Sequence, residues 1–238
     1  MNSTENLNVK IFADGADKEA MIDMYNKEYI KGLTTNPTLM KKAGITDYEN
    51  FAKDILKTVK DKPLSLEVFS DDIQDMKRQA LKIAEWGENV YVKIPVTNTK
   101  SESTAKLVKE LSDNGVKVNV TAIMTLDQVK KVVDSLNPDV PAYVSVFAGR
   151  IADTGIDPLP LMKEVVNITK AKPLAEVIWA SPRELLNVFH ADSIGCQVIT
   201  VTNDILKKLK LVGYDLNEYS LDTVKMFYND SVSAGYKL

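Results

Sequence analysis

A lysine lies inside the apolar segment VYVKIP at residues 90–95, and this position allows two kinds of behaviour. Burying an ammonium group without a partner is costly, and a buried lysine can avoid that cost by losing its proton. A neutral lysine amine is a nucleophile that attacks carbonyl carbons and forms Schiff bases. The alternative is a strand-end lysine whose stem packs on apolar neighbours while its ammonium group reaches water. Lys93 is therefore either the centre of an active site or an ordinary surface group.

Polar residues at equivalent positions of other apolar segments favour the active site. Successive side chains of a strand point to opposite faces, so if the aliphatic residues of 90–95 face outwards, Lys93 faces inwards. The same assignment turns Phe147 inwards and Ala122 outwards. In four further β-branched segments it turns these polar side chains inwards: Asp14, Glu67, Asn119, Thr121 and Ser145. One shared polar space explains this set better than isolated strand ends that meet solvent.

The elements that must position these residues alternate regularly along the chain. Strands are expected at 9–14, 31–36, 64–69, 90–95, 116–123, 142–148, 174–180 and 196–201. Helices are expected at 17–28, 47–60, 72–86, 101–113, 126–136, 158–171, 182–191 and 203–210. Eight strand–helix units predict an α/β fold, a (β/α)₈ TIM-type barrel whose active site lies at the carboxyl ends of the strands. An open doubly wound sheet is the alternative, but no G-x-G-x-x-G motif follows the first strand.

The chain divides into three parts. Residues 1–8 form a polar extension that we expect to be disordered. Residues 9–216 form the catalytic barrel. Residues 217–238 form an additional helix and tail with an apolar stripe, which either caps the barrel or docks on a neighbouring subunit.

Composition excludes several classes of function. The chain has 238 residues and a formal net charge of −3, which argues against a nucleic-acid-binding surface. A single cysteine allows no intramolecular disulfide, and a single histidine excludes paired-histidine metal chemistry. No apolar run approaches the roughly 18 residues of a membrane span, and the N-terminus lacks the apolar core of a signal peptide. We therefore expect a cytoplasmic protein without nucleic-acid or membrane partners.

Two arginines follow predicted strands near their carboxyl ends. Arg150 lies in SVFAGRIADTG, and Arg183 lies in ASPRE, where Ser181 precedes it. Guanidinium groups pair bidentately with phosphate, and the N–H groups at the start of a following helix add donors. These residues predict a phosphate site, with ordinary surface salt bridges as the alternative for either arginine.

Taken together, the chain resembles the transaldolase family, specifically the short form that is grouped with fructose-6-phosphate aldolases. The resemblance extends over almost the whole chain, from FADGA at 12–16 to the C-terminal helix. It rests on six segments in this order: TTNPTL (34–39), LEVFS (66–70), VKIPVT (92–97), NVTAIMT (119–125), SVFAGRIADTG (145–155) and ASPRE (180–184).

The resemblance implies a role for each residue of the polar set. Lys93 is the implied Schiff-base lysine, and Asp14 handles the proton of the C4 hydroxyl as the C3–C4 bond breaks. Glu67 and Thr121 hold the catalytic water. Asn36 and Asn119 are implied to hold substrate hydroxyls or the dihydroxyacetone adduct, and Thr35, Ser145 and Phe147 are implied to line the same substrate-binding site. The residues implied to bind the sugar phosphate are Arg150, Ser181 and Arg183.

The resemblance also implies sugar-phosphate substrates, a place in the pentose phosphate pathway, and no metal or organic cofactor. It implies a homo-oligomer, a ring of five or ten subunits in which the terminal helix reaches across to a neighbour.

Two activities within the family differ at three positions. Fructose-6-phosphate aldolases typically carry glutamine where Glu67 stands, tyrosine where Phe147 stands and alanine where Ser145 stands. A phenol at position 147 could donate to the catalytic water and help release free dihydroxyacetone, whereas a phenyl ring cannot. We therefore expect a transaldolase. The alternatives are an aldolase that releases free dihydroxyacetone and a non-catalytic sugar-phosphate-binding barrel.

Overall fold

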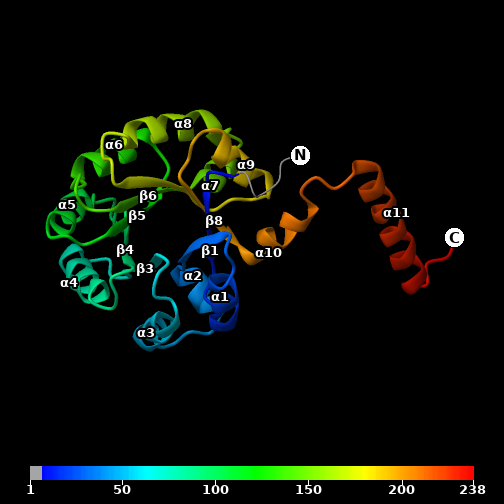
Figure 1. The fold of residues 1–238 in the computed structure, drawn as a ribbon, viewed down its shortest axis with the longest axis horizontal. Coiled ribbons are helices and arrows are strands. Elements are labelled where there is room, and N and C mark those ends of the chain that lie inside the picture. The colour runs from blue at the N-terminus through cyan, green and yellow to red at the C-terminus, as the bar shows by residue number, and fades with distance from the viewer. Residues whose placement is uncertain (1–6) are drawn as a thin grey trace.

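A closed barrel of eight parallel strands forms the centre of the computed structural model, which describes residues 7–238 (Figure 1). The strands pair in sequence order, and β8 closes the barrel by pairing with β1. This arrangement confirms the predicted (β/α)₈ barrel and excludes the open sheet. The strands are β1 Lys10–Asp14, β2 Ile30–Thr34, β3 Leu64–Glu67, β4 Val90–Pro95, β5 Val118–Ile123, β6 Ala142–Val146, β7 Ala175–Trp179 and β8 Val198–Thr202.

Amphipathic helices surround the barrel and bury the outward-facing aliphatic residues of the strands (Figure 1). A second, smaller apolar cluster fills the barrel interior, where Phe12 meets Tyr143 edge to face at 5.6 Å between ring centroids. This apolar cluster fills the barrel on the amino-terminal side of the polar residues at the strand ends. The surrounding helices are α1 Lys18–Tyr25, α3 Tyr48–Thr58, α4 Ile73–Ala84, α5 Ala105–Asp113, α6 Leu126–Ser135, α8 Pro158–Thr169, α9 Leu186–Ser193 and α10 Asn203–Leu206.

Two short helices that the sequence analysis did not predict begin directly after strands. Helix α2, Pro37–Lys42, has a clear local cause, because the Asn36 side chain accepts a hydrogen bond from the backbone N–H of Leu39 and proline occupies the first helical position. Helix α7, Ala148–Asp153, has no side-chain cap. Both helices contribute residues to the cavity at the carboxyl ends of the strands, Pro37 and Leu39 from α2 and Arg150 from α7.

Strand β5 contains an irregularity that reverses one prediction. The register with β6 shifts between Val120 and Ile123, and Ala122 adopts a left-handed conformation with φ of 62°. A bulge adds one residue to the strand and so breaks the alternation of side-chain directions. Ala122 therefore lines the cavity that opens at the carboxyl ends of the barrel strands, and the expectation that it faces outwards is wrong.

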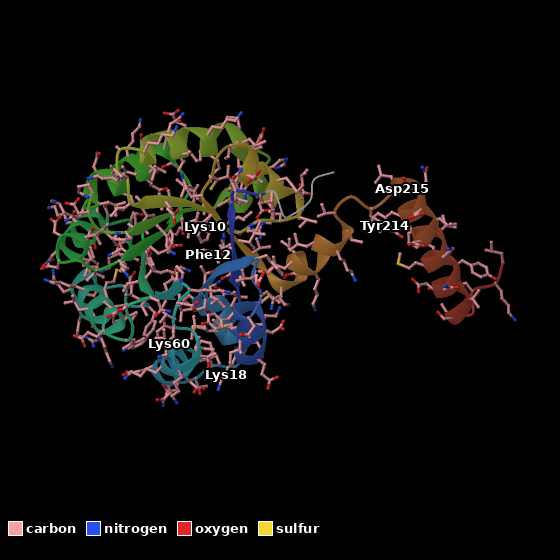
Figure 2. The ribbon with its side chains drawn as sticks, viewed as in Figure 1. Lys10, Phe12, Lys18, Lys60, Tyr214 and Asp215 are labelled. Carbon is pink, nitrogen blue, oxygen red and sulfur yellow. The ribbon has the colours of Figure 1, made fainter. Side chains whose placement is uncertain are left out.

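Helix α11, Leu216–Ser233, stands apart from the barrel (Figure 1). Figure 2 shows Tyr214 and Asp215 at its start, where the Asp215 carboxylate caps the helix by accepting from the backbone N–H groups at positions 217 and 218. No residue of this fully described helix is buried, so the helix does not cap its own barrel. Among residues 7–238, no helix has the length and apolar character that a membrane crossing requires.

Most of the predicted extension at 1–8 lies outside the described residues. Of its two described residues, Leu7 packs against the apolar core, and the backbone N–H of Asn8 donates to an Asp192 carboxylate oxygen at 2.7 Å.

Candidate active site

A cavity of about 680 Å³ opens at the carboxyl ends of the strands, and it collects nearly all of the predicted site residues. Because parallel barrel strands all end at the same mouth, residues from distant parts of the chain meet there. Of the predicted residues, the cavity is lined by Asp14, Asn36, Glu67, Lys93, Asn119, Thr121, Ser145, Phe147, Arg150, Ser181 and Arg183.

Lys93 lies in the cavity wall with its side chain almost fully buried. The residue is 6% exposed, its Nζ atom lies 3.1 Å from Glu67 Oε2, and the same atom donates a hydrogen bond to the backbone oxygen of Thr35 at 2.9 Å. This geometry excludes the alternative of a strand-end lysine that reaches water. Nucleophilic attack requires the unprotonated amine. The Glu67 carboxylate and the Thr35 carbonyl oxygen together fix the position of that nitrogen in the cavity wall.

Thr35 contributes to the site through its backbone. Its side chain is fully buried and is not part of the cavity lining, and among the described residues its hydroxyl has no hydrogen-bond partner. Its carbonyl oxygen instead orients the Lys93 ammonium or amine group. The expectation that the Thr35 side chain lines the site therefore does not match this structure.

A hydrogen-bonded group of side chains holds Asp14 at the end of β1. The Thr34 hydroxyl donates to Asp14 Oδ1 at 2.7 Å and is itself bonded to the hydroxyl of Thr200, while Asn36 Nδ2 lies 3.4 Å from Asp14 Oδ2. Burial raises the pKa of Asp14 above its ordinary value, and the charge of Lys93 and the bond from Thr34 offset this only in part. A carboxyl group of this kind exchanges protons closer to neutral pH than a free aspartate does.

A buried chain of three side chains fixes the amide of Asn119 next to the lysine. Ser145 Oγ donates to Asn119 Oδ1 at 2.6 Å, and Asn119 Nδ2 donates to Ser65 Oγ at 3.0 Å. The amide nitrogen keeps a second N–H, which can donate to a bound hydroxyl. Ser65 was not predicted as a site residue, although the inward direction of its strand position was apparent from the alternation.

The two arginines lie at the mouth of the cavity, on the side formed by the ends of β6 and β7. The guanidinium group of Arg150 lies over the Phe147 ring, 5.6 Å from its centroid. Arg183 forms an ion pair with Asp153 and still lines the cavity. The surface salt bridge and the phosphate site are thus not exclusive alternatives for Arg183.

Strand β8 supplies cavity residues that the sequence analysis missed. Thr200 and Thr202 line the cavity, as does Asp204 at the following helix, where a hydrogen bond from Thr202 holds the Asp204 pKa below its ordinary value. The signal was present, because Ile199 and Val201 pack in the outer core and leave the threonines to face inwards. Applying the alternation to this strand finds both threonines.

The backbone at Gly149, next to Arg150, packs closely against the backbone at Ser181, so the two segments that carry the predicted phosphate-binding residues are in contact. A Cβ atom added at Gly149 would lie 1.6 Å from the carbonyl oxygen of Ser181, a separation that requires the backbone to shift. We expect Gly149→Ala to lower the free energy of unfolding by about 1–3 kcal/mol, measured by urea denaturation. The matched control is Gly15→Ala, whose added Cβ meets its nearest neighbour at 4.0 Å. Equal stability of the two variants would contradict the expected clash.

Within residues 7–238, no group of three or more histidine, cysteine, aspartate or glutamate side chains is arranged to hold a metal ion.

The fold and the site together define a class: (β/α)₈ barrels with a buried lysine, adjacent carboxyl groups and an arginine-bearing mouth. A family model described as Transaldolase/Fructose-6-phosphate aldolase matches residues 11–237, and the chain belongs to this family.

Similar proteins extend over most of the chain. A protein named "Probable transaldolase" from Methanococcus maripaludis strain C5 is 35% identical over 202 residues, which cover 84% of this chain and 89% of the relative. One with the same name from Dehalococcoides mccartyi is 34% identical over 202 residues, 84% of this chain and 90% of the relative. A third from Thermoanaerobacter sp. strain X514 is 32% identical over 231 residues, 97% of this chain and 100% of the relative.

Proposed function

We propose that the chain is a cytoplasmic transaldolase. It transfers a dihydroxyacetone unit from a ketose phosphate, sedoheptulose 7-phosphate or fructose 6-phosphate, to an aldose phosphate through a Schiff base on Lys93. The observation that carries the proposal is the buried Lys93 amine 3.1 Å from Glu67, in one cavity with Asp14. Membership of the family and the names of the relatives support it.

The first half of the reaction ends with cleavage of the donor. The Lys93 amine attacks the ketone carbon, and the resulting carbinolamine loses water to give the iminium ion, with the water held by Glu67 and Thr121. Asp14 takes the proton of the C4 hydroxyl as the C3–C4 bond breaks. The electron pair of that bond passes to the iminium nitrogen, an aldose phosphate leaves, and the dihydroxyacetone unit remains on Lys93 as an enamine.

The second half reverses these steps with a new aldehyde. The enamine carbon attacks the acceptor carbonyl, and Asp14 returns its proton to the new hydroxyl. Water then hydrolyses the imine and restores the Lys93 amine. Asn36, Asn119 and Ser145 hold the hydroxyl groups of the dihydroxyacetone unit, and the phosphate binds to Arg150, Ser181 and Arg183.

Phe147 supports transfer over release of free dihydroxyacetone. Its ring lines the cavity beneath Arg150 and carries no hydroxyl group that could donate to the catalytic water, so it does not assist protonation of the enamine carbon or hydrolysis of the resulting iminium ion. A coupled assay with fructose 6-phosphate, run with and without erythrose 4-phosphate, separates the transaldolase from the aldolase alternative. Turnover that depends on the acceptor supports the transaldolase, and equal turnover without it supports the aldolase.

Borohydride trapping tests the covalent step itself. Reduction in the presence of fructose 6-phosphate should add a dihydroxyacetone-derived or hexose-derived group to Lys93, identified by peptide mass. A non-catalytic sugar-phosphate-binding barrel would gain no covalent adduct, so this experiment separates an enzyme from a binding protein.

We further propose that the chain forms a homo-oligomer, a ring of five or ten subunits, in which helix α11 docks on a second copy. Apolar side chains of this helix are exposed, Leu221, Val224, Phe227 and Tyr228 among them at 52%, 60%, 61% and 68%. Ending the chain after Tyr214 should reduce the sedimentation mass to that of a monomer. A full-length chain that sediments as a monomer would contradict the proposal.

A further inference from the structure

Arg183 is held on one edge by a carboxylate that does not itself line the cavity. Its Nε atom donates to Asp153 Oδ1 at 3.0 Å, and its Nη2 atom donates to Asp153 Oδ2. Asp153 is the last residue of helix α7, thirty positions away in sequence, and is absent from the lining of the 680 Å³ cavity, which includes Arg183. The carboxylate therefore acts on the cavity only through the arginine.

We propose that Asp153 is a positioning residue for substrate phosphate: it holds the guanidinium group of Arg183 in the orientation that receives the phosphate of a sugar phosphate. This inference rests on the proposed function and adds to it a residue that the substrate does not touch.

The hydrogen-bond inventory of the guanidinium group leaves room for this role. An arginine side chain carries five N–H donors in a rigid planar fork. Asp153 takes one donor from Nε and one from Nη2, which leaves three donors, two on Nη1 and one on Nη2. Because the fork is planar, fixing one edge also fixes the direction of the remaining donors. A phosphate at the cavity mouth then meets donors that are already aligned.

The backbone of Arg183 is fixed independently of Asp153. The backbone N–H groups of Arg183 and Glu184 donate to the Asn187 side-chain oxygen at 2.8 and 3.2 Å. Gly149, at the start of α7, packs directly on the Ser181 carbonyl group. Loss of the Asp153 carboxylate should therefore free the guanidinium group without moving the loop that carries it.

Because the ion pair is exposed, we expect Asp153 to contribute little to the stability of the fold. The side chains of Arg183 and Asp153 are 47% and 52% exposed. Exposed ion pairs contribute little to stability, because water screens the charges and two long side chains must be ordered. A variant at position 153 should fold normally, so its effect on phosphate binding can be measured.

The test is Asp153→Asn, which keeps the size of the side chain and removes its charge. We expect the KM for fructose 6-phosphate to rise about three- to tenfold, the scale set by leaving one long side chain unordered, with kcat within about twofold of the parent. The dissociation constant of inorganic phosphate, measured by titration calorimetry, should rise by a similar factor. Asp153→Glu should restore both values in part.

The matched control is Asp75→Asn on helix α4. Asp75 is the carboxylate partner of Arg78, with 2.6 Å between Nε and Oδ1, and neither residue lines the cavity. This variant removes an exposed arginine–aspartate pair of the same kind and should leave both KM and phosphate binding unchanged.

Three outcomes would overturn the inference. Unchanged KM and phosphate affinity in Asp153→Asn would show that the ion pair is only structural. A lower KM would show that the carboxylate competes with phosphate for Arg183. If the parent protein did not bind inorganic phosphate, there would be no phosphate site for Asp153 to organise. Trapping of unphosphorylated dihydroxyacetone on Lys93 with borohydride is the separate readout for the proposed function, since it requires no phosphate site.

Discussion

Lys93→Met should abolish turnover of the ketose phosphate, with a fall in kcat of about 10⁴-fold or more, the scale seen when a covalent nucleophile is removed. Methionine has a side chain of similar length but no amine, so neither the carbinolamine nor the imine can form. The measurement is the steady-state rate in the coupled assay, together with the loss of the borohydride adduct at position 93. Substrate can still bind through the arginines at the cavity mouth, so protection of the variant against heat by sugar phosphate should persist.

Lys10→Met is the matched control for this variant. Lys10 also lies on a strand and pairs with a glutamate, Glu176, at 2.5 Å between Nζ and Oε1. It lies at the opposite end of the barrel, where β1 begins (Figure 2). We expect Lys10→Met to retain both turnover and trapping. Full activity in Lys93→Met would remove the basis of the proposed function.

Asp14→Asn should reduce kcat by about 10²–10⁴-fold, the usual contribution of a positioned acid–base group. The amide can still accept the hydrogen bond from Thr34, but it cannot take the proton of the C4 hydroxyl. The Schiff base itself should still form, because its nitrogen comes from Lys93. Rapid-quench measurement of the borohydride adduct separates these steps, and slow adduct formation in Asp14→Asn would contradict the assigned role.

The same variant should change how stability depends on pH. Because burial raises the pKa of Asp14 in the folded protein, the folded state holds this proton more tightly than the unfolded state does. The resulting stabilisation is complete below the ordinary value of 3.8 and is lost as pH rises through the raised folded-state pKa. The asparagine side chain of the variant carries no such proton to lose. The Tm of Asp14→Asn relative to the parent should therefore rise from pH 4 to pH 8, and a constant difference in Tm would contradict this linkage.

Alternation of side chains along the strands predicted most of the site, because the barrel forces every inward polar residue near a strand end into one space. It placed Asp14, Glu67, Lys93 and Ser145 correctly in the lining of a single cavity. It failed at Ala122, where the bulge in β5 breaks the period of two that the rule assumes.

Other features depend on contacts that no local pattern encodes. The pairing of Arg183 with Asp153 arises only when α7 packs against the loop after β7, thirty positions further along the chain. The carbonyl oxygen of Thr35 acts on Lys93 as backbone, so the residue type gives no indication of its role. The Arg183–Asp153 pair and the contact between the Thr35 carbonyl oxygen and Lys93 are therefore visible only in the folded structure.

The lateral alignment of β3, β4 and β5 has a consequence for how this protein can vary. Glu67 pairs with Lys93, and Lys93 pairs with Asn119, so the main-chain hydrogen bonds set the separation between the backbones of neighbouring residues in this row at the strand spacing of about 4.8 Å. Insertions in the connections outside the barrel leave that spacing unchanged. A single residue inserted within β4 before Lys93 would turn the amine into the layer of helices, so the number of residues between the start of β4 and Lys93 is tightly constrained.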